Sequence, residues 1–370
     1  MALLLFSCSG CSPVYVARAG WAEMKILYAR KPLDRVIQDP ATDADTRRKL
    51  LLAQEARDFA IHSLELDAGK SYTTFTRLES DTLALVLSAA HRDRLQFRTW
   101  WFPIVGHVPY RGFFSQEAAE KAQGSLEAEG FDTYLRPTAA FSTLGFFADP
   151  LLSTLLRYDS VDFVETILHE LAHNHLFVRS HVRFNESFAT FVGRVGAIRF
   201  FCGPALQASD SVGQASDSGF RAPDRDVLES DAEFQASNQD KCQLARDRWA
   251  AYQEYSNFLD GFVDELQAVY GNTDLTTQEK IEAREGLFAT TKDAYFVDGA
   301  PPSPANPLIL GFLSRPLNNA ILLSRMLYFH RLPDFQSLLD EHDGHLPSAI
   351  LFLTKGVGSV DDPFDLLPRG

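Results

Sequence analysis

The sequence predicts an α+β protein with a small mixed β region in its first half and a mostly helical second half. The chain of 370 residues is 45% hydrophobic and 12% aromatic, which is enough apolar material for a buried core. Segments rich in β-branched and aromatic residues and bounded by turn signals lie within residues 82–147, whereas apolar residues at helical spacing prevail after residue 150. No linker-like stretch precedes residue 200, so one domain is expected over residues 12–204 and 241–360.

The first half of the chain is expected to mix short helices and strands. Residues 14–33 carry aromatics at roughly helical spacing, and a second helix is expected from Asp39, with Pro40 at its first position, to about Leu66. Ser115–Glu129 is expected to be helical, because Gly130 is a typical helix end. Strands are expected at residues 82–90, 96–108, 131–136 and 141–147.

The second half is expected to be helical apart from one insertion. Asp159 or Ser160 is expected to cap the helix that carries the histidine motif described below. Residues 205–240 are small, polar and acidic, and Gln207–Ser211 recurs as Gln214–Ser218, which predicts a mobile insertion. Helices are expected at residues 151–157, 159–176, 185–201, 246–270, 276–295, 318–329 and 333–339, and the last dozen residues are expected to form a tail.

The charge balance excludes one class of partner. The formal net charge is -14, and a nucleic-acid-binding protein needs a concentrated basic face, so nucleic acid is not expected as a partner. No apolar run is long enough to predict a membrane-spanning helix.

The N-terminus resembles the end of a bacterial lipoprotein signal. A short apolar run, Met1–Phe6, is followed by small residues and then by Cys11, which is expected to be the acylated residue, with Cys8 as the second candidate. Residues 1–11 would then be a signal remnant, and the protein would be periplasmic and attached to the outer membrane through its lipid. A cytosolic terminus with a C-x-x-C pattern is the competing interpretation.

Two further cysteines lie far apart in the sequence. In an oxidising compartment Cys202 and Cys242 could pair across the insertion, and two separate buried thiols are equally compatible with the sequence.

The strongest chemical signal is the run His169-Glu170-Leu171-Ala172-His173, an H-E-x-x-H pattern inside an expected helix. Residues four apart lie on one helix face, so His169 and His173 can bind the same ion. Glu170 is then adjacent to a metal-bound water rather than to the metal itself. This arrangement predicts a zinc-dependent hydrolase with Glu170 as general base.

A catalytic zinc site needs a third protein ligand and an open position for water. Glu186 lies in the run Asn185–Ala189 at the start of the next expected helix, at a distance that an antiparallel return of the chain can span. His169, His173 and Glu186 are therefore the predicted zinc ligands, although another metal could use the same set.

Other residues near the motif have weaker functional interpretations. His175 points off the metal face and is expected to be solvated or behind the ligands, and His181 is expected to be an exposed loop residue. Glu165 can orient an imidazole from behind, or it can be an ordinary surface acid. Tyr328 can donate to an oxyanion, or it can belong to the core. Ser142, Thr143, Leu144 and Gly145 can form an edge strand that pairs with a peptide substrate, or a plain sheet edge.

These motifs resemble a bacterial family of predicted aminopeptidases, which are zincin-like lipoproteins. The likeness is carried by the segments Arg98–Gly112, Ser142–Gly145, Phe163–Val192 and Asn318–Ala320. The resemblance implies a zincin-like metallopeptidase fold, a periplasmic location and a zinc-dependent peptidase with the ligands and the base named above. Family members often carry cysteines where this chain has Trp101 and His107, so a disulfide in that β region is expected to be absent here.

The leading hypothesis is a zinc peptidase, an aminopeptidase by family resemblance, that hydrolyses peptides with water activated by Glu170. An exopeptidase needs a carboxylate for the substrate's α-amino group, and Ser142–Gly145 contains none, so a zinc endopeptidase stays open. Two further hypotheses are compatible with the sequence, namely a catalytically dispensable envelope assembly factor or scaffold and a non-peptide amide hydrolase.

Overall fold

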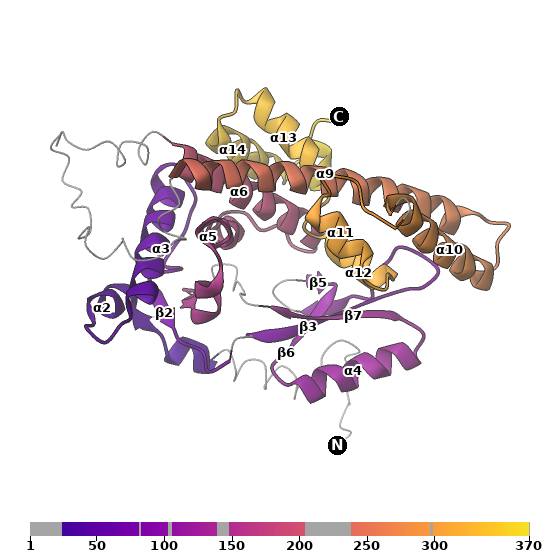
Figure 1. The fold of residues 1–370 in the computed structure, drawn as a ribbon, viewed down its shortest axis with the longest axis horizontal. Helices are drawn as coiled ribbons and strands as arrows, with labels where there is room; N and C mark the ends of the chain where they lie inside the picture. The colour runs from indigo at the N-terminus through magenta and orange to yellow at the C-terminus, as the bar shows by residue number, and fades with distance from the viewer. Residues whose placement is uncertain are drawn as a thin grey trace, which may run out of the picture.

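The computed structural model describes residues 24–80, 83–102, 106–138, 148–203, 238–296 and 299–369. Over these residues the fold is mixed α/β and mostly helical, and Figure 1 shows a small sheet beneath a layer of helices. No helix in these segments has the length and apolar character needed to cross a membrane. The predicted edge strand Ser142–Gly145 and the cysteines Cys8 and Cys11 lie outside the described residues.

The main sheet is built around β3 (Ala84–Ala90). This strand pairs antiparallel with β6 (Tyr110–Phe113) on one edge and with β7 (Asp132–Thr138) on the other. The strands predicted at residues 82–90 and 131–136 are therefore confirmed, whereas β6 is an additional strand. Residues 96–108 form a separate hairpin of β4 (Trp100–Phe102) and β5 (Gly106–Val108), which places Trp101 opposite His107.

Helices cover both faces of this sheet (Figure 1). α4 (Gln116–Ala128) packs on one face and α12 (Asn319–Met326) on the other. The α4 helix is confirmed with its predicted ends, because Ser115 accepts a hydrogen bond from the Ala118 N–H and Gly130 follows with a φ of +88°.

The helical layer is centred on three helices that contact one another, α5 (Ser160–His175), α6 (Val182–Cys202) and α9 (Asn238–Gly271). Asp159 caps α5 as predicted, accepting hydrogen bonds of 2.9 Å from the backbone N–H groups of Val161 and Asp162. The predicted helix at 185–201 is confirmed but begins at Val182, and the one at 246–270 extends over the whole of α9.

Two predictions in the N-terminal half differ from the structure in their bounds. The helix expected from Asp39 is α3 (Ala44–His62), which begins after Asp43, because Asp43 accepts from the Thr46 N–H at 2.8 Å whereas Asp39 closes a local turn with Ala41. Of the segment 14–33, only the part from Met24 is described, and residues 24–28 in it are helical. The chain then forms β1 (Lys31–Pro32) and α2 (Leu33–Gln38).

The helix expected at 151–157 is confirmed only in part. Its first residues form β8 (Leu151–Leu152), which pairs in parallel with β2 (Thr74–Thr76), and only a 3-10 turn, η1 (Ser153–Arg157), follows. The backbone N–H and C=O groups of Leu151 and Leu152 pair with a strand more than seventy residues away in the sequence, so they are not used in a helix.

The C-terminal region contains more structure than predicted. α10 (Thr277–Tyr295) begins at a capping box of Thr276 and Glu279, and α13 (Leu332–Glu341) is confirmed. α11 (Pro307–Leu313) and α14 (Leu346–Gly356) are additional helices. The predicted tail is wrong, because η3 (Pro363–Leu366) buries Phe364 against Phe184 and Phe335.

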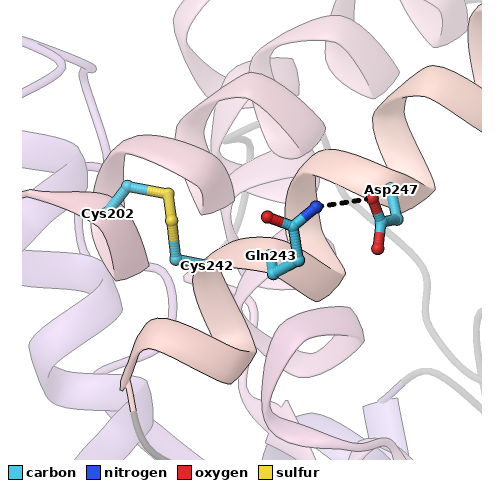
Figure 2. Close-up of a disulfide and its surroundings, with 4 residues drawn as sticks. All are labelled: Cys202, Cys242, Gln243 and Asp247. Atoms are coloured by element: carbon cyan, nitrogen blue, oxygen red, sulfur yellow. Dashed lines mark hydrogen bonds between the residues drawn. A yellow bond between two sulfur atoms is a disulfide. The ribbon is translucent and has the colours of Figure 1, made fainter.

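A disulfide joins the last residue of α6 to a residue near the start of α9. Cys202 and Cys242 are bonded with a Cα–Cα distance of 4.9 Å, and Figure 2 shows the bridge between the two helices. α9 begins at Asn238, so the last residues of the predicted insertion at 205–240 are helical, and residues 204–237 lie outside the described residues.

Candidate metal centre

The candidate site is assembled by the close pairing of α5 and α6. A Cβ atom added at Gly193 on α6 would lie 2.8 Å from the Glu165 carbonyl oxygen and 3.1 Å from the His169 Cβ. At Gly196 it would lie 2.8 Å from Leu168. The absence of side chains at these two positions therefore lets the helix with the third predicted ligand approach the helix with the histidines.

The loop between the two helices is held by the first residue of the N-E-x-x-A run. The Asn185 side-chain amide donates to the Val178 carbonyl at 2.8 Å, and its carbonyl accepts from the Val178 N–H at 2.9 Å. These two hydrogen bonds fix the return of the chain, so the next residue, Glu186, faces the histidines.

His169, His173 and Glu186 come together in the structure. Glu186 Oε2 lies 3.4 Å from His169 Nε2 and 3.4 Å from His173 Nε2, and all three ligand atoms lie within 4.8 Å of one another. The side chains are almost fully buried. Burial alone would raise the pKa of the Glu186 carboxyl, but the two histidines hold this pKa well below its usual range.

These residues fit a zinc ion by their chemistry and spacing. Zinc bonds of about 2.0–2.1 Å in a tetrahedral arrangement place neighbouring ligand atoms about 3.4 Å apart. That separation matches both nitrogen–oxygen distances in the cluster. Two imidazoles and one carboxylate also form the ligand set of zinc sites that leave a fourth position open for water.

Glu170 lies beside this cluster and lines the same cavity. Burial raises the pKa of its carboxyl to about 7, while the adjacent His173 acts in the opposite direction. A carboxyl group with a pKa near neutrality is suited to accept and release protons.

Tyr328 packs against the imidazole ring of His169. Its ring is stacked on the imidazole with centroids 6.1 Å apart, and its hydroxyl oxygen accepts a hydrogen bond from Arg136 Nη2 at 3.3 Å. Burial raises the pKa of Tyr328 to about 12, so the phenol stays protonated. Because the guanidinium only donates, the hydroxyl hydrogen of Tyr328 remains available to another acceptor.

Ser187, the residue after Glu186, links the cluster to Tyr328. Its hydroxyl donates to the Leu327 carbonyl at 3.0 Å and accepts from the His330 N–H at 3.4 Å. The predicted ligand and the tyrosine are thus held in a fixed relation, because Ser187 and Leu327, their neighbours in the sequence, are bonded across a separation of 140 residues.

The cluster opens into a cavity of about 740 Å³ between the α5–α6 pair and the sheet. Its walls include residues of β3, β6, β7 and α12 as well as the two site helices. Polar groups in the wall that the sequence patterns do not single out include Tyr110, Tyr134, Arg136, Ser324 and Arg325. Tyr110 lies in a segment that carries the family resemblance, whereas the others have no local sequence signal.

The remaining candidates lie around the cluster without joining it. His175 accepts a hydrogen bond from the Asp67 N–H at 3.1 Å and contacts Thr354, and His181 occupies the N-cap position of α6. Glu165 lines the cavity, but its carboxylate is 3.5 Å from Arg194 Nε and is bonded to Thr166.

The two imidazoles and Glu170 come from the H-E-x-x-H helix α5, and the converging carboxylate of Glu186 comes from α6. This arrangement is typical of metal-dependent hydrolases. The chain belongs to the family described as "Putative aminopeptidase", whose model matches residues 14–354. This membership supports a peptidase function in general. No curated protein and no solved structure matches the chain significantly.

Proposed function

We propose that the protein is a zinc-dependent peptidase with a zincin-like catalytic domain, and an aminopeptidase in its mode of cleavage. The observation that carries the proposal is the placement of Glu186 Oε2 at 3.4 Å from both His169 Nε2 and His173 Nε2, beside Glu170 in one cavity. In this proposal the three residues hold the zinc ion, which would polarise the substrate carbonyl and a bound water.

Each neighbouring side chain has a chemical role in the proposed reaction. Glu170 accepts the proton of the attacking water and passes it to the leaving amine. Tyr328 donates a hydrogen bond to the oxyanion as the carbonyl carbon becomes tetrahedral. Arg136 holds the phenol by donating to its oxygen.

The aminopeptidase mode needs a carboxylate that holds the free α-amino group of the substrate. Glu165 is the cavity carboxylate that remains after Glu170 and Glu186 have been assigned, and Arg194 fixes it from behind. Peptides with a free N-terminus and their N-acetylated forms test this mode, because only the free forms would be cleaved by an aminopeptidase.

An exported, lipid-anchored protein is part of the same proposal. The disulfide between Cys202 and Cys242 supports an oxidising compartment such as the periplasm.

The test combines metal analysis with peptide cleavage. Glu170→Gln is expected to keep the zinc of the wild-type protein and to lose hydrolysis of a peptide library, because an amide cannot accept the proton of water. His169→Ala is expected to lose both zinc and activity. His175→Gln, on the same helix but outside the cluster, is the matched control and should keep both. A wild-type protein without zinc, or a fully active Glu170→Gln variant, would contradict the proposal.

A further inference from the structure

The cavity wall opposite the predicted zinc ligands has its own chemical character. We propose that this wall, formed by Arg136 on β7 and by Ser324 and Arg325 on α12, binds a carboxylate group of the substrate. This inference rests on the proposed peptidase function and names its substrate class, namely peptides that carry a carboxylate close to the cleaved bond.

Arg136 is a cation whose guanidinium has more N–H donors than it uses within the described residues. It lines the cavity, and among the described residues its side-chain hydrogen bond is the one to the Tyr328 hydroxyl. Burial alone would lower the pKa of Arg136, but the nearby Tyr328, Glu186 and Tyr134 raise it, so the group is always charged. The remaining N–H groups of a planar guanidinium match the two oxygens of a carboxylate.

Two further donors in the same wall have no partner among the described residues. The Ser324 hydroxyl and the Arg325 Nε are buried without a hydrogen bond, and both residues line the cavity. Ser324 is only 4% exposed. Buried polar groups are normally paired, so these two donors would gain a partner from a ligand with acceptor atoms.

Charge is divided between the two sides of the cavity. The carboxylates Glu165, Glu170 and Glu186 all belong to α5 and α6, whereas the guanidinium groups of Arg136 and Arg325 belong to β7 and α12. No ion pair joins either arginine to an acidic side chain within the described segments. A carboxylate is therefore expected to find its complementary charge at the β7–α12 wall.

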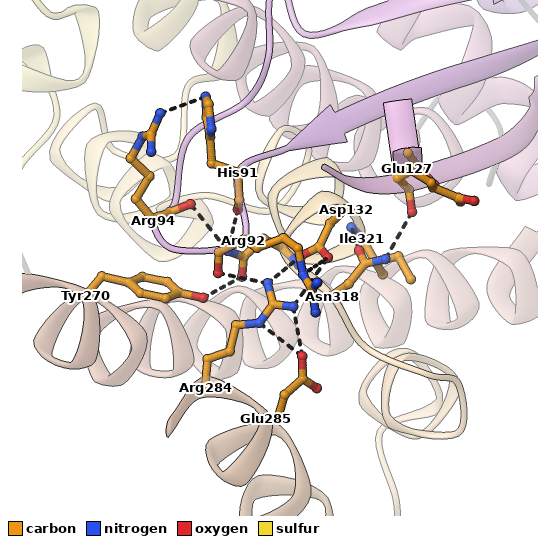
Figure 3. Close-up of polar contacts among 12 residues, drawn as sticks. His91, Arg92, Arg94, Glu127, Asp132, Tyr270, Arg284, Glu285, Asn318 and Ile321 are labelled. Atoms are coloured by element: carbon orange, nitrogen blue, oxygen red, sulfur yellow. Dashed lines mark hydrogen bonds and ion pairs between the residues drawn. The ribbon is translucent and has the colours of Figure 1, made fainter. Parts of the chain in front are cut away.

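The wall is also rigid, because a buried polar network fixes α12 to β7 (Figure 3). Arg284 Nη1 donates to Asp132 Oδ2 at 2.5 Å, and the same oxygen accepts from the Asn319 N–H at 3.0 Å. Asn318 donates to the Thr133 carbonyl at 3.0 Å. Asp132 starts β7 and Asn319 starts α12, so the two elements that carry the arginines keep a fixed separation before any substrate binds.

The carboxylate can come from two places in a peptide. It is either the C-terminal carboxylate of a short peptide or the side chain of an Asp or Glu next to the cleaved bond. A cavity of about 740 Å³ lies within the range of about 300–1,000 Å³ that is typical of small-ligand sites, which suits short substrates.

The experiment compares matched peptides with the zinc-loaded protein. One arm uses trialanine and its C-terminal amide, and the other uses amidated tripeptides that differ only by aspartate against asparagine. In at least one of the two arms, the kcat/KM of the charged peptide is expected to exceed that of its neutral partner by roughly ten-fold or more. Arg325→Met is expected to remove this preference while leaving cleavage of the neutral peptide within a factor of about two.

Further variants separate charge recognition from folding. Arg136→Met is expected to reduce the preference and also the rate on neutral peptides, because it releases Tyr328. Arg315→Met, at an exposed position outside the cavity wall, should retain the full preference. Equal kcat/KM values for charged and neutral peptides in both arms would overturn the carboxylate site, and so would an unchanged preference in a folded Arg325→Met.

A binding measurement keeps this test separate from the proposed function. Calorimetry with zinc-loaded Glu170→Gln is expected to show roughly ten-fold tighter binding for the charged peptide of the preferred pair, without turnover. If the wild-type protein hydrolyses no peptide but this difference is found and is lost in Arg325→Met, the peptidase proposal fails while the carboxylate site stands. If peptides are cleaved without any preference and the binding difference is absent, only the carboxylate site fails.

Discussion

Glu170 and Glu186 are carboxyl groups that line one cavity, yet their surroundings move their pKa values in opposite directions. Burial dominates at Glu170 and raises its pKa to about 7. At Glu186 two imidazole nitrogens at 3.4 Å overcome the same effect and lower the pKa. A permanent carboxylate is suited to hold a cation, and a carboxyl that titrates near neutrality is suited to transfer protons, so the environment separates the proposed roles of the two residues.

Tyr328→Phe tests the proposed oxyanion donor. The substitution keeps the ring that stacks on His169 and removes only the hydroxyl that Arg136 holds. We expect kcat to fall by about 100-fold or more with little change in KM, because the hydrogen bond strengthens only as the oxyanion forms. Steady-state kinetics on one peptide would measure this, with the exposed Tyr28→Phe as the control. An unchanged kcat would assign Tyr328 to packing alone.

At the scale of elements, the site depends on how closely α5 and α6 pack. Gly193 faces Glu165 and His169 on α5. Gly196, about one turn further along α6, faces Leu168. Glycine normally weakens a helix, so these residues cost intrinsic helix stability in exchange for close approach of the two helices.

Gly193→Ala is expected to destabilise the protein by about 1–3 kcal/mol through overpacking. It should also weaken zinc binding, because the added methyl group would push Glu165 and His169 away from α6. Gly261→Ala in α9 is the matched control: the added Cβ meets nothing within 4 Å, and the change should stabilise by about 0.5–1 kcal/mol. Chemical denaturation and zinc titration measure both effects, and a stabilising Gly193→Ala would refute the packing argument.

The N-cap of α5 makes stability depend on acid pH. Burial alone would raise the pKa of Asp159, but hydrogen bonds from Arg248 and from the α5 backbone lower it to about 2. In the unfolded chain it would be about 3.9. The folded state therefore gains stability from this carboxylate above about pH 4 and loses it as the pH falls through about 2.

Asp159→Asn is expected to be less stable than the wild type at pH 7 and to differ from it less at pH 2. Asparagine still caps a helix but cannot form the ion pair with Arg248. Denaturation curves at the two pH values test this, with Asp58→Asn on the exposed face of α3 as the control. A constant difference at both pH values would show that the charge of Asp159 contributes nothing.

At the scale of the whole molecule, the disulfide and the buried network tie together parts that are distant in sequence. Cys202 and Cys242 connect α6, which carries Glu186, to α9 across a separation of 40 residues. Arg284 and Asp132 connect α10 to β7 and, through Asn319, to α12 (Figure 3). The disulfide thus stabilises the α6–α9 side of the cavity, and the buried network stabilises the β7–α12 side.

Replacing both cysteines by serine tests the contribution of the disulfide. Closing a loop of this length restricts the unfolded chain, so the free energy of unfolding should fall by about 2–4 kcal/mol. Zinc content at 25 °C should stay the same, because neither cysteine contacts the cluster. Denaturation of the wild type with and without reductant provides the comparison, and loss of zinc from a folded double variant would contradict this separation.

The sequence by itself determined the local features of this protein. His169 and His173 share a helix face, Asp159 caps that helix, and Glu186 returns on the next one, because helix periodicity and capping act over a few residues. The tertiary structure alone decided that Cys202 reaches Cys242, that Leu151–Leu152 forms a strand, and that Arg136 and Arg325 share a cavity wall with Tyr328. Those contacts join elements far apart in the chain, and their formation depends on how the whole molecule packs.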